Sequence, residues 1–298
     1  MGRQSTRKCH WVPQSYLKAF ACDEKREKIW RFEKPKRGIE LKKFERKPIE
    51  KIPVRNYLYV PRDQDGLTDN SFENRLANEI EPIFSDPVWI LLQTEMVDLS
   101  WEPLRMMVAL AASVLLLRTP LEFEQYSQMH SAMVDMLEDF EGENVTINVG
   151  HSDQKIDWDE FSIYRNWSDD DIKRSWISFI SGAGAIADDL KSMRWSILRS
   201  ETRSFITSDN PVTVLHPSTD FRGLNDPLTT VRFPISPTHV LYFDHRHLEP
   251  PNQYYSYPEP ANLNMLMWRN SLEHAFSHRQ PNEVVNEMLD LSEKYNNS

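Results

Sequence analysis

Apolar side chains recur along this chain with two periods, one typical of strands and one typical of helices. Residues 28–33 alternate polar and apolar positions, which predicts a half-buried strand. Residues 72–84 carry an apolar side chain at every fourth position, which predicts an amphipathic helix. Residues 106–117 are apolar on nearly every side and therefore predict the most buried helix. Long helices are also predicted over residues 168–193 and 260–278.

Strand signals concentrate in the C-terminal half. Short apolar runs at residues 195–199, 205–215, 230–235 and 239–243 predict one small antiparallel meander. The basic N-terminal region has weak strand signals over residues 39–53, and a further short strand is predicted over residues 56–60. A turn is predicted at residues 35–38. Helices are predicted for most of the rest. The predicted fold class is therefore α+β, mostly helical with a small antiparallel sheet and a short N-terminal β region.

The amino-acid composition excludes some classes of function but does not identify one. Eight glycines in 298 residues, with neither GxGxxG nor GxxxxGK[ST], exclude the usual phosphate-binding glycine loops. Cys9 and Cys22 are the only cysteines, too few for a cysteine zinc site or a disulfide framework. No apolar segment typical of a signal peptide follows residues 1–7. The apolar run over residues 106–117 is too short to cross a membrane. We expect a cytoplasmic protein with no membrane partner.

Charge is divided unevenly along the chain. Residues 1–62 contain 18 Lys and Arg against 7 Asp and Glu, whereas residues 63–298 contain 17 against 38. We expect one domain over residues 1–298, in which the basic N-terminal lobe packs on the acidic helical body. The alternative is that the basic lobe binds a polyanion such as nucleic acid.

One strand is expected to end in a cluster of small polar residues. The strand-forming residues 205–207 are followed by Ser208, Asp209, Asn210 and Pro211. Asp and Asn side chains bond to nearby backbone, and proline lacks an N–H donor, so this segment predicts a strand that runs into a turn. A carboxylate, an amide and a hydroxyl would then lie together at the edge of a sheet.

Four segments, in their order along the chain, resemble a known family. They are His10-x-x-Pro13, Asn56-Tyr57, Arg118-Thr119-Pro120 and the segment from Ile206 to Val212. Together they are similar to the Domain of Unknown Function 4238 family over most of the chain, and the segment from Glu73 to Glu81 looks like the acidic helix of that family. The resemblance implies a single domain of bacterial type and implies no particular activity.

Each candidate side chain has both a functional and a structural interpretation. His10 is either a general base or metal ligand, or a capping residue at the start of a helix. Asp209 is either a base or ligand, or the former of an Asx turn. Arg118 either holds a phosphate or carboxylate, or pairs with Glu73 or Glu81. His274 and His278, four residues apart, would share a helix face but lack the HExxH glutamate.

Two classes of function fit these residues. The first is a hydrolase for a phosphorylated or nucleic-acid substrate, in which the basic lobe holds the polyanion. Its catalytic candidates are His10, Asp209, Glu73 and Glu81. Its substrate-binding candidates are Arg118, Ser208, Asn210 and Tyr57. No residue is assigned to a metal and no cofactor is identified, although paired carboxylates could bind a divalent cation. The alternative is a non-catalytic binding module whose polar motifs are structural.

Overall fold

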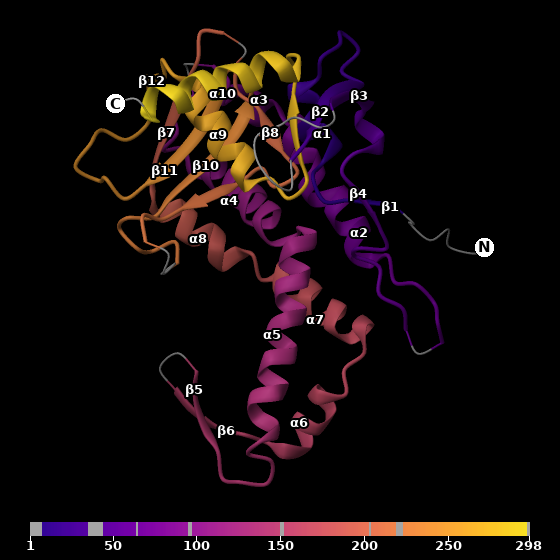
Figure 1. The fold of residues 1–298 in the computed structure, drawn as a ribbon. Helices are drawn as coiled ribbons and strands as arrows, with labels where there is room; N and C mark the ends of the chain where they lie inside the picture. The colour runs from indigo at the N-terminus through magenta and orange to yellow at the C-terminus, as the bar shows by residue number, and fades with distance from the viewer. Residues whose placement is uncertain are drawn as a thin grey trace.

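The fold is α+β, as the sequence predicts (Figure 1). The computed structural model describes residues 8–34, 44–63, 65–94, 97–149, 152–202, 204–218 and 223–296. The turn predicted at residues 35–38 lies outside these ranges. The helices, with short 3₁₀ and π segments labelled η, are α1 (Gln14–Leu17), η1 (Lys18–Phe20), η2 (Ile49–Lys51), α2 (Ser71–Arg75), η3 (Leu76–Ile80), η4 (Glu81–Ser85), α3 (Pro87–Leu91), α4 (Glu102–Leu117), α5 (Pro120–Glu138), α6 (Trp158–Arg165), α7 (Asp169–Ser181), α8 (Gly184–Ser192), α9 (Pro260–Asn270) and α10 (Pro281–Asn296).

The larger sheet contains most of the predicted meander. Its strand order is β12-β7-β11-β10-β9, and every pair is antiparallel except β12 with β7. The strands are β7 (Arg194–Arg199), β9 (Thr213–Leu215), β10 (Thr230–Ser236), β11 (His239–Asp244) and β12 (Gln253–Ser256). Alternating apolar side chains of β10 and β11 are fully buried, which explains why their sequence signals were clear.

A second sheet joins the N-terminal β region to the C-terminal half. Its order is β3-β2-β13-β8, antiparallel throughout. Its strands are β2 (Lys28–Glu33), β3 (Phe44–Pro48), β8 (Thr207–Ser208) and β13 (His274–Ser277). Two separate ribbons pair β1 (Lys8–His10) with β4 (Val54–Asn56), and β5 (Thr146–Val149) with β6 (Ser152–Lys155).

The prediction that residues 205–215 belong to one sheet is wrong. β8 pairs with β13 in the second sheet, whereas β9 pairs with β10 in the first. The turn at Asp209 and Asn210 separates the two strands, since Pro211 cannot donate a ladder hydrogen bond. This polar turn therefore lies where the two sheets meet.

Two predicted helices are shorter than expected. The helix predicted over residues 168–193 breaks between α7 and α8, where Gly182 and Gly184 disfavour a continuous helix. The helix predicted over residues 260–278 ends at Asn270, and His274 lies in β13. His274 and His278 therefore do not share a helix face, and that interpretation is wrong.

The predicted helix over residues 72–84 is present but changes its winding. It begins as the α-helix α2, continues as the π-helical segment η3, and ends as the 3₁₀ segment η4. Phe72, Leu76 and Ile80 are buried along it, as their spacing predicts. A π-helix turns through a smaller angle per residue than an α-helix, so side chains after η3 face a different direction.

α4 is the central helix of the body. Val108, Ala112 and Leu115 are fully buried, which agrees with the predicted core helix. The first turns differ from that prediction, since Met106 has 44% of its surface exposed. One hydrophobic cluster reaches from Cys9 to Phe276 and includes this helix. The N-terminal lobe thus contributes side chains to the same cluster as the helical body.

α5, α6, α7 and the β5–β6 ribbon form an arm that extends below the two sheets (Figure 1). The basic lobe contacts this arm: Arg55 pairs with Glu124 at 3.1 Å, and the Arg62 N–H donates to Asp170 at 3.0 Å. Within the described part of the chain, no single helix is both long and apolar enough to cross a membrane, and the pair α4 and α5 that passes this test together bends by 61°.

Candidate functional site

Arg118, immediately after α4, is fully buried and is anchored to the N-terminal segment. Its Nε donates to the carbonyl of Trp11 at 2.8 Å, and its Nη2 donates to the carbonyl of His10 at 2.6 Å. These charge-assisted bonds fix the two motifs against each other. Among the described residues, the third guanidinium nitrogen, Nη1, has no hydrogen-bond partner although it is buried.

Two glutamates flank this guanidinium. Glu81 Oε1 lies 3.7 Å from Arg118 Nη2, and the Glu81 side chain is 30% exposed. Burial raises the pKa of Glu73 to about 7, Arg118 opposes that increase, and the charge of Glu81 adds to it. Both acids can face Arg118 because the π-helical segment between them changes the direction of Glu81. Glu73 is therefore a carboxyl that titrates near neutral pH.

His10 lies at the partly exposed edge of the same group. Its Nε2 lies 3.1 Å from the carbonyl of Glu50, to which it donates when protonated. Burial lowers the pKa of His10, while the charges of Glu81 and Arg118 act on it in opposite directions. The imidazole is thus neutral near pH 7 and available as a base.

Cys9 and Tyr59 complete the surroundings of Arg118, and the sequence did not indicate either of them. Cys9 is fully buried, and burial next to the Glu73 carboxylate raises the pKa of its thiol to about 11. The thiol is therefore uncharged and unreactive near neutral pH. The Tyr59 hydroxyl donates to the carbonyl of Arg118, and its ring lies beneath the guanidinium. Tyr59 follows the Asn56-Tyr57 motif by two residues.

Asp209 is fully buried, and its carboxylate binds three backbone N–H groups. Oδ1 accepts the N–H of Leu272 at 2.7 Å, and Oδ2 accepts those of Glu273 and His274 at 2.8 and 2.9 Å. Burial raises the pKa of Asp209 to about 6, and the three N–H donors oppose that increase. These amides follow α9, so their bonds to Asp209 end that helix and direct the chain into β13.

Trp11 connects this turn to Arg118. The indole Nε1 of Trp11 donates to the carbonyl of Asp209 at 2.7 Å, while the Trp11 carbonyl accepts from Arg118. A second bond lies nearby, between the hydroxyls of Tyr16 and Thr207 at 2.7 Å. His10, Arg118 and Asp209 therefore belong to one hydrogen-bond network, which they join through the His10 carbonyl, the Arg118 guanidinium and the Asp209 carbonyl.

Ser208 and Asn210 bond within the turn and to α9. Ser208 Oγ donates to the carbonyl of Asn210 at 2.8 Å. The amides of Asn210 and Asn270 each donate to the backbone carbonyl of the other residue, at 3.2 and 3.0 Å. These bonds brace the end of β8 against α9.

Tyr57 lies directly after β4 and begins a turn. The strand predicted over residues 56–60 is wrong, because β4 ends at Asn56 and the left-handed φ of 56° at Tyr57 turns the chain there. The carbonyl of Tyr57 accepts from Lys173 Nζ at 3.2 Å, which ties the loop to α7.

Metal binding has no evident donor set in the described ranges. No group of three or more His, Cys, Asp or Glu side chains among these residues is placed to share an ion. Glu73 and Glu81 both contact Arg118 electrostatically, which already supplies a positive charge to the pair. A carboxyl that titrates near neutral pH beside a fixed cation can take part in proton transfer.

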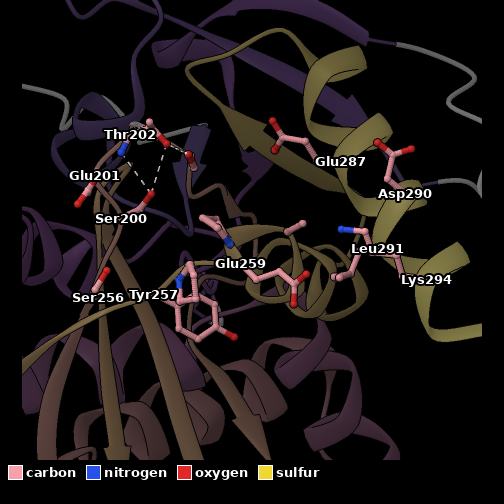
Figure 2. Close-up of a pocket in the computed structure, with 14 residues that line it drawn as sticks. Ser200, Glu201, Thr202, Ser256, Tyr257, Glu259, Glu287, Asp290, Leu291 and Lys294 are labelled. Carbon is pink, nitrogen blue, oxygen red and sulfur yellow. Dashed lines mark hydrogen bonds between the residues drawn. The ribbon is translucent and has the colours of Figure 1, made fainter. Parts of the chain in front are cut away.

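Among the described residues, clefts are also present beyond this group, and two of them are large. One, of about 590 Å³, lies between the ends of β7 and β12, the start of α9, and α10 (Figure 2). Its charged lining residues are Glu201, Glu259, Glu287, Asp290 and Lys294. Glu287 is already paired with Arg279 through bonds of 2.6 and 2.7 Å. A second cleft, of about 720 Å³, lies where α5 begins, and its lining combines aliphatic side chains with polar ones that include Asn210.

The protein is thus of the α+β class, and hydrogen bonds around the buried Arg118 connect segments that are distant in the sequence. Residues 8–288 match the family described as Protein of unknown function (DUF4238), and the chain belongs to that family. Neither the curated proteins nor the solved structures contain a match to this chain.

Proposed function

We propose that this protein is a hydrolase of phosphate esters, acting on a phosphorylated or nucleic-acid substrate. Its catalytic groups are His10 and Glu73, with Glu81 and Arg118 beside them. One observation supports this most strongly. The Glu73 carboxyl, with a pKa of about 7, lies next to a buried arginine whose Nη1 has no hydrogen-bond partner among the described residues.

The three kinds of group match what phosphate ester hydrolysis requires. A neutral His10 takes the proton of the attacking water, and a protonated Glu73 gives its proton to the leaving oxygen. Arg118 stabilises the negative charge that develops on the phosphoryl oxygens. The substrate would approach past His10, Glu73 and Glu81, which are all partly exposed, toward the buried Arg118.

The basic N-terminal lobe supplies the substrate-holding surface in this proposal. Lys8 and Arg55 lie on the β1–β4 ribbon that carries His10, and both are exposed, with Arg55 also paired to Glu124. Their charges would attract a polyanion toward the catalytic group and make its binding weaken as salt rises. Asp209, Ser208 and Asn210 would position Trp11 and act through it, because their side-chain bonds lie within the turn and to the chain after α9.

Hydrolysis assays test this directly. Purified protein is incubated with bis(p-nitrophenyl) phosphate, p-nitrophenyl phosphate, and single-stranded DNA and RNA oligonucleotides. Glu73→Gln keeps the shape of the side chain but removes its titration, and should lower kcat/KM by about 100-fold or more. Glu79→Gln, an exposed neighbour on the same segment, is the matched control and should retain the wild-type rate. Equal rates for the Glu73→Gln and wild-type proteins would exclude the assigned role.

The second candidate is a non-catalytic binding module, and a specific observation favours it. Nε and Nη2 of Arg118 and both carboxylate oxygens of Asp209 are bonded to backbone, as a purely structural network would require. Oligonucleotide binding without product release, unchanged in the Glu73→Gln protein, would support this candidate over the hydrolase.

A further inference from the structure

A stripe of large apolar side chains is exposed along α5. Met129, Met133 and Met136 are exposed by 54%, 38% and 54%, and Phe140, just beyond the helix end, by 45%. Their spacing of four, three and four residues places them on one face of the helix. Four large apolar side chains in a continuous row differ from the scattered exposure that is normal on a protein surface.

A different face of α5 holds the helix in the arm. His130 is buried, bonds to the carbonyl of Tyr164 at 2.9 Å, and stacks on Trp167. Leu137 is also buried, and the Tyr126 hydroxyl bonds to Ser175 at 2.7 Å. The arm is therefore built without the methionine stripe, which stays on the surface.

The stripe continues into the cleft of about 720 Å³ at the start of the helix. Leu121 and Gln125 line that cleft. They precede Met129 by eight and four residues, so all three side chains lie on the same side of α5. Leu117 and Val214 form part of the aliphatic lining beyond them. The cleft and the stripe together form a docking surface about as long as α5.

The charge of the arm indicates which occupant this surface fits. Residues 120–181 contain 14 Asp and Glu against four Lys and Arg, a net charge of −10. A second copy would place an equal negative charge against the first, which disfavours self-association through this face. An anionic lipid surface would be repelled in the same way. A positively charged partner is attracted instead.

We propose that the α5 stripe and its cleft bind a basic amphipathic helix of a partner protein. The apolar side chains of such a helix, spaced by three and four residues, would pack on Met129, Met133, Met136 and Phe140. Methionine is flexible and polarizable, so it adapts to apolar side chains of different shapes. The Lys and Arg residues of the partner would complement the acidic arm. This inference does not depend on the proposed hydrolase activity.

Peptide binding to the full-length protein tests the inference. The probe is a fluorescent Leu/Lys amphipathic helix of about 20 residues, long enough to cover α5. The reference is a peptide of the same composition, scrambled to remove the apolar face. By fluorescence anisotropy, the amphipathic peptide should bind, more weakly at higher salt, and the scrambled peptide should not. Equal binding of both peptides, or of neither, would overturn the proposal.

Substitutions then locate the contact. Met129→Gln, Met133→Gln and Met136→Gln combined should weaken binding by about tenfold or more, since they remove the apolar anchors. Ile163→Gln is the control, because Ile163 is 69% exposed on α6 outside the stripe. An unchanged Kd in the triple variant would overturn the proposal. So would a dimer in light scattering that the triple variant abolishes, or binding to phosphatidylserine vesicles that the triple variant loses.

Discussion

The guanidinium of Arg118 donates to the main-chain carbonyl of His10, 108 residues earlier in the chain, across 2.6 Å. The bond connects two of the sequence motifs. His10-x-x-Pro13 contributes a backbone carbonyl, and Arg118-Thr119-Pro120 contributes a buried cation. It explains why an arginine follows the apolar α4 directly, because only a long, branched donor reaches both the His10 and Trp11 carbonyls. This bond holds His10 in the position that the proposed site requires of its general base.

Replacing Arg118 with lysine should therefore destabilise the whole protein. A lysine ammonium cannot satisfy both carbonyls with the fork geometry of a guanidinium, so we expect a loss of about 2–4 kcal/mol in the free energy of unfolding. Urea denaturation followed by circular dichroism measures it. Arg55→Lys is the matched control, since the Arg55–Glu124 pair is exposed and should change stability by less than about 1 kcal/mol. Similar losses in the two variants would contradict the role given to Arg118.

Asp209 offers a second test, because its carboxylate binds three amides. Asparagine has only one acceptor oxygen, so Asp209→Asn must turn an NH₂ group toward at least one backbone N–H. We expect Asp209→Asn to lower stability by about 2–4 kcal/mol in urea denaturation. Asp135→Asn, at an exposed position on α5, should leave stability within about 0.5 kcal/mol of wild type.

That expectation differs from what the sequence suggested for Asp209. An Asx turn uses one side-chain oxygen locally, and asparagine would preserve it. The partners at Leu272 to His274 are more than 60 residues away, and no local pattern indicates them. The same long-range contact ends α9 early, which is why periodicity alone extended that helix to residue 278.

The strands of the larger sheet were predictable because each buries one face. Val231, Phe233 and Ile235 alternate inward on β10, and this period of two is visible in the sequence. The partition of β8 and β9 between two sheets was not predictable, since short strands carry little pairing information. Among the candidate site residues, Glu73 and Glu81 could be named, but their shared direction depends on the π-helical segment between them.

The buried face of α4 gives a third prediction, which compares two leucines that differ in burial. Leu115 is fully buried, whereas Leu110 is only partly buried. Leu115→Ala should cost about 2–5 kcal/mol in the free energy of unfolding, because a cavity remains where the side chain packed. Leu110→Ala should cost less in the same urea titration. A larger loss at Leu110 would show that the helix is rotated relative to this structure.

Titration of Glu73 gives a fourth prediction, on stability against pH. Its pKa is about 7 in the folded protein, against an ordinary value of 4.5 that applies once the chain unfolds. Between pH 4.5 and 7 the folded state holds a proton that the unfolded state has released, so this group stabilises the fold less and less as pH rises. Glu73→Gln removes the dependence. Its melting temperature relative to wild type should therefore increase from pH 5 to pH 8.

Thermal denaturation of both proteins at matched ionic strength measures this difference. Other groups, including Asp209, titrate in the same range, but they are common to both proteins and cancel in the comparison. Glu79→Gln serves again as the control, because Glu79 is exposed. The melting temperature of the Glu79→Gln protein relative to wild type should stay constant with pH. A constant difference for Glu73→Gln as well would mean that Glu73 is ionised like an ordinary glutamate. It could then not be the proton donor of the proposed reaction near neutral pH, and the binding module would become the better explanation of the Arg118 network.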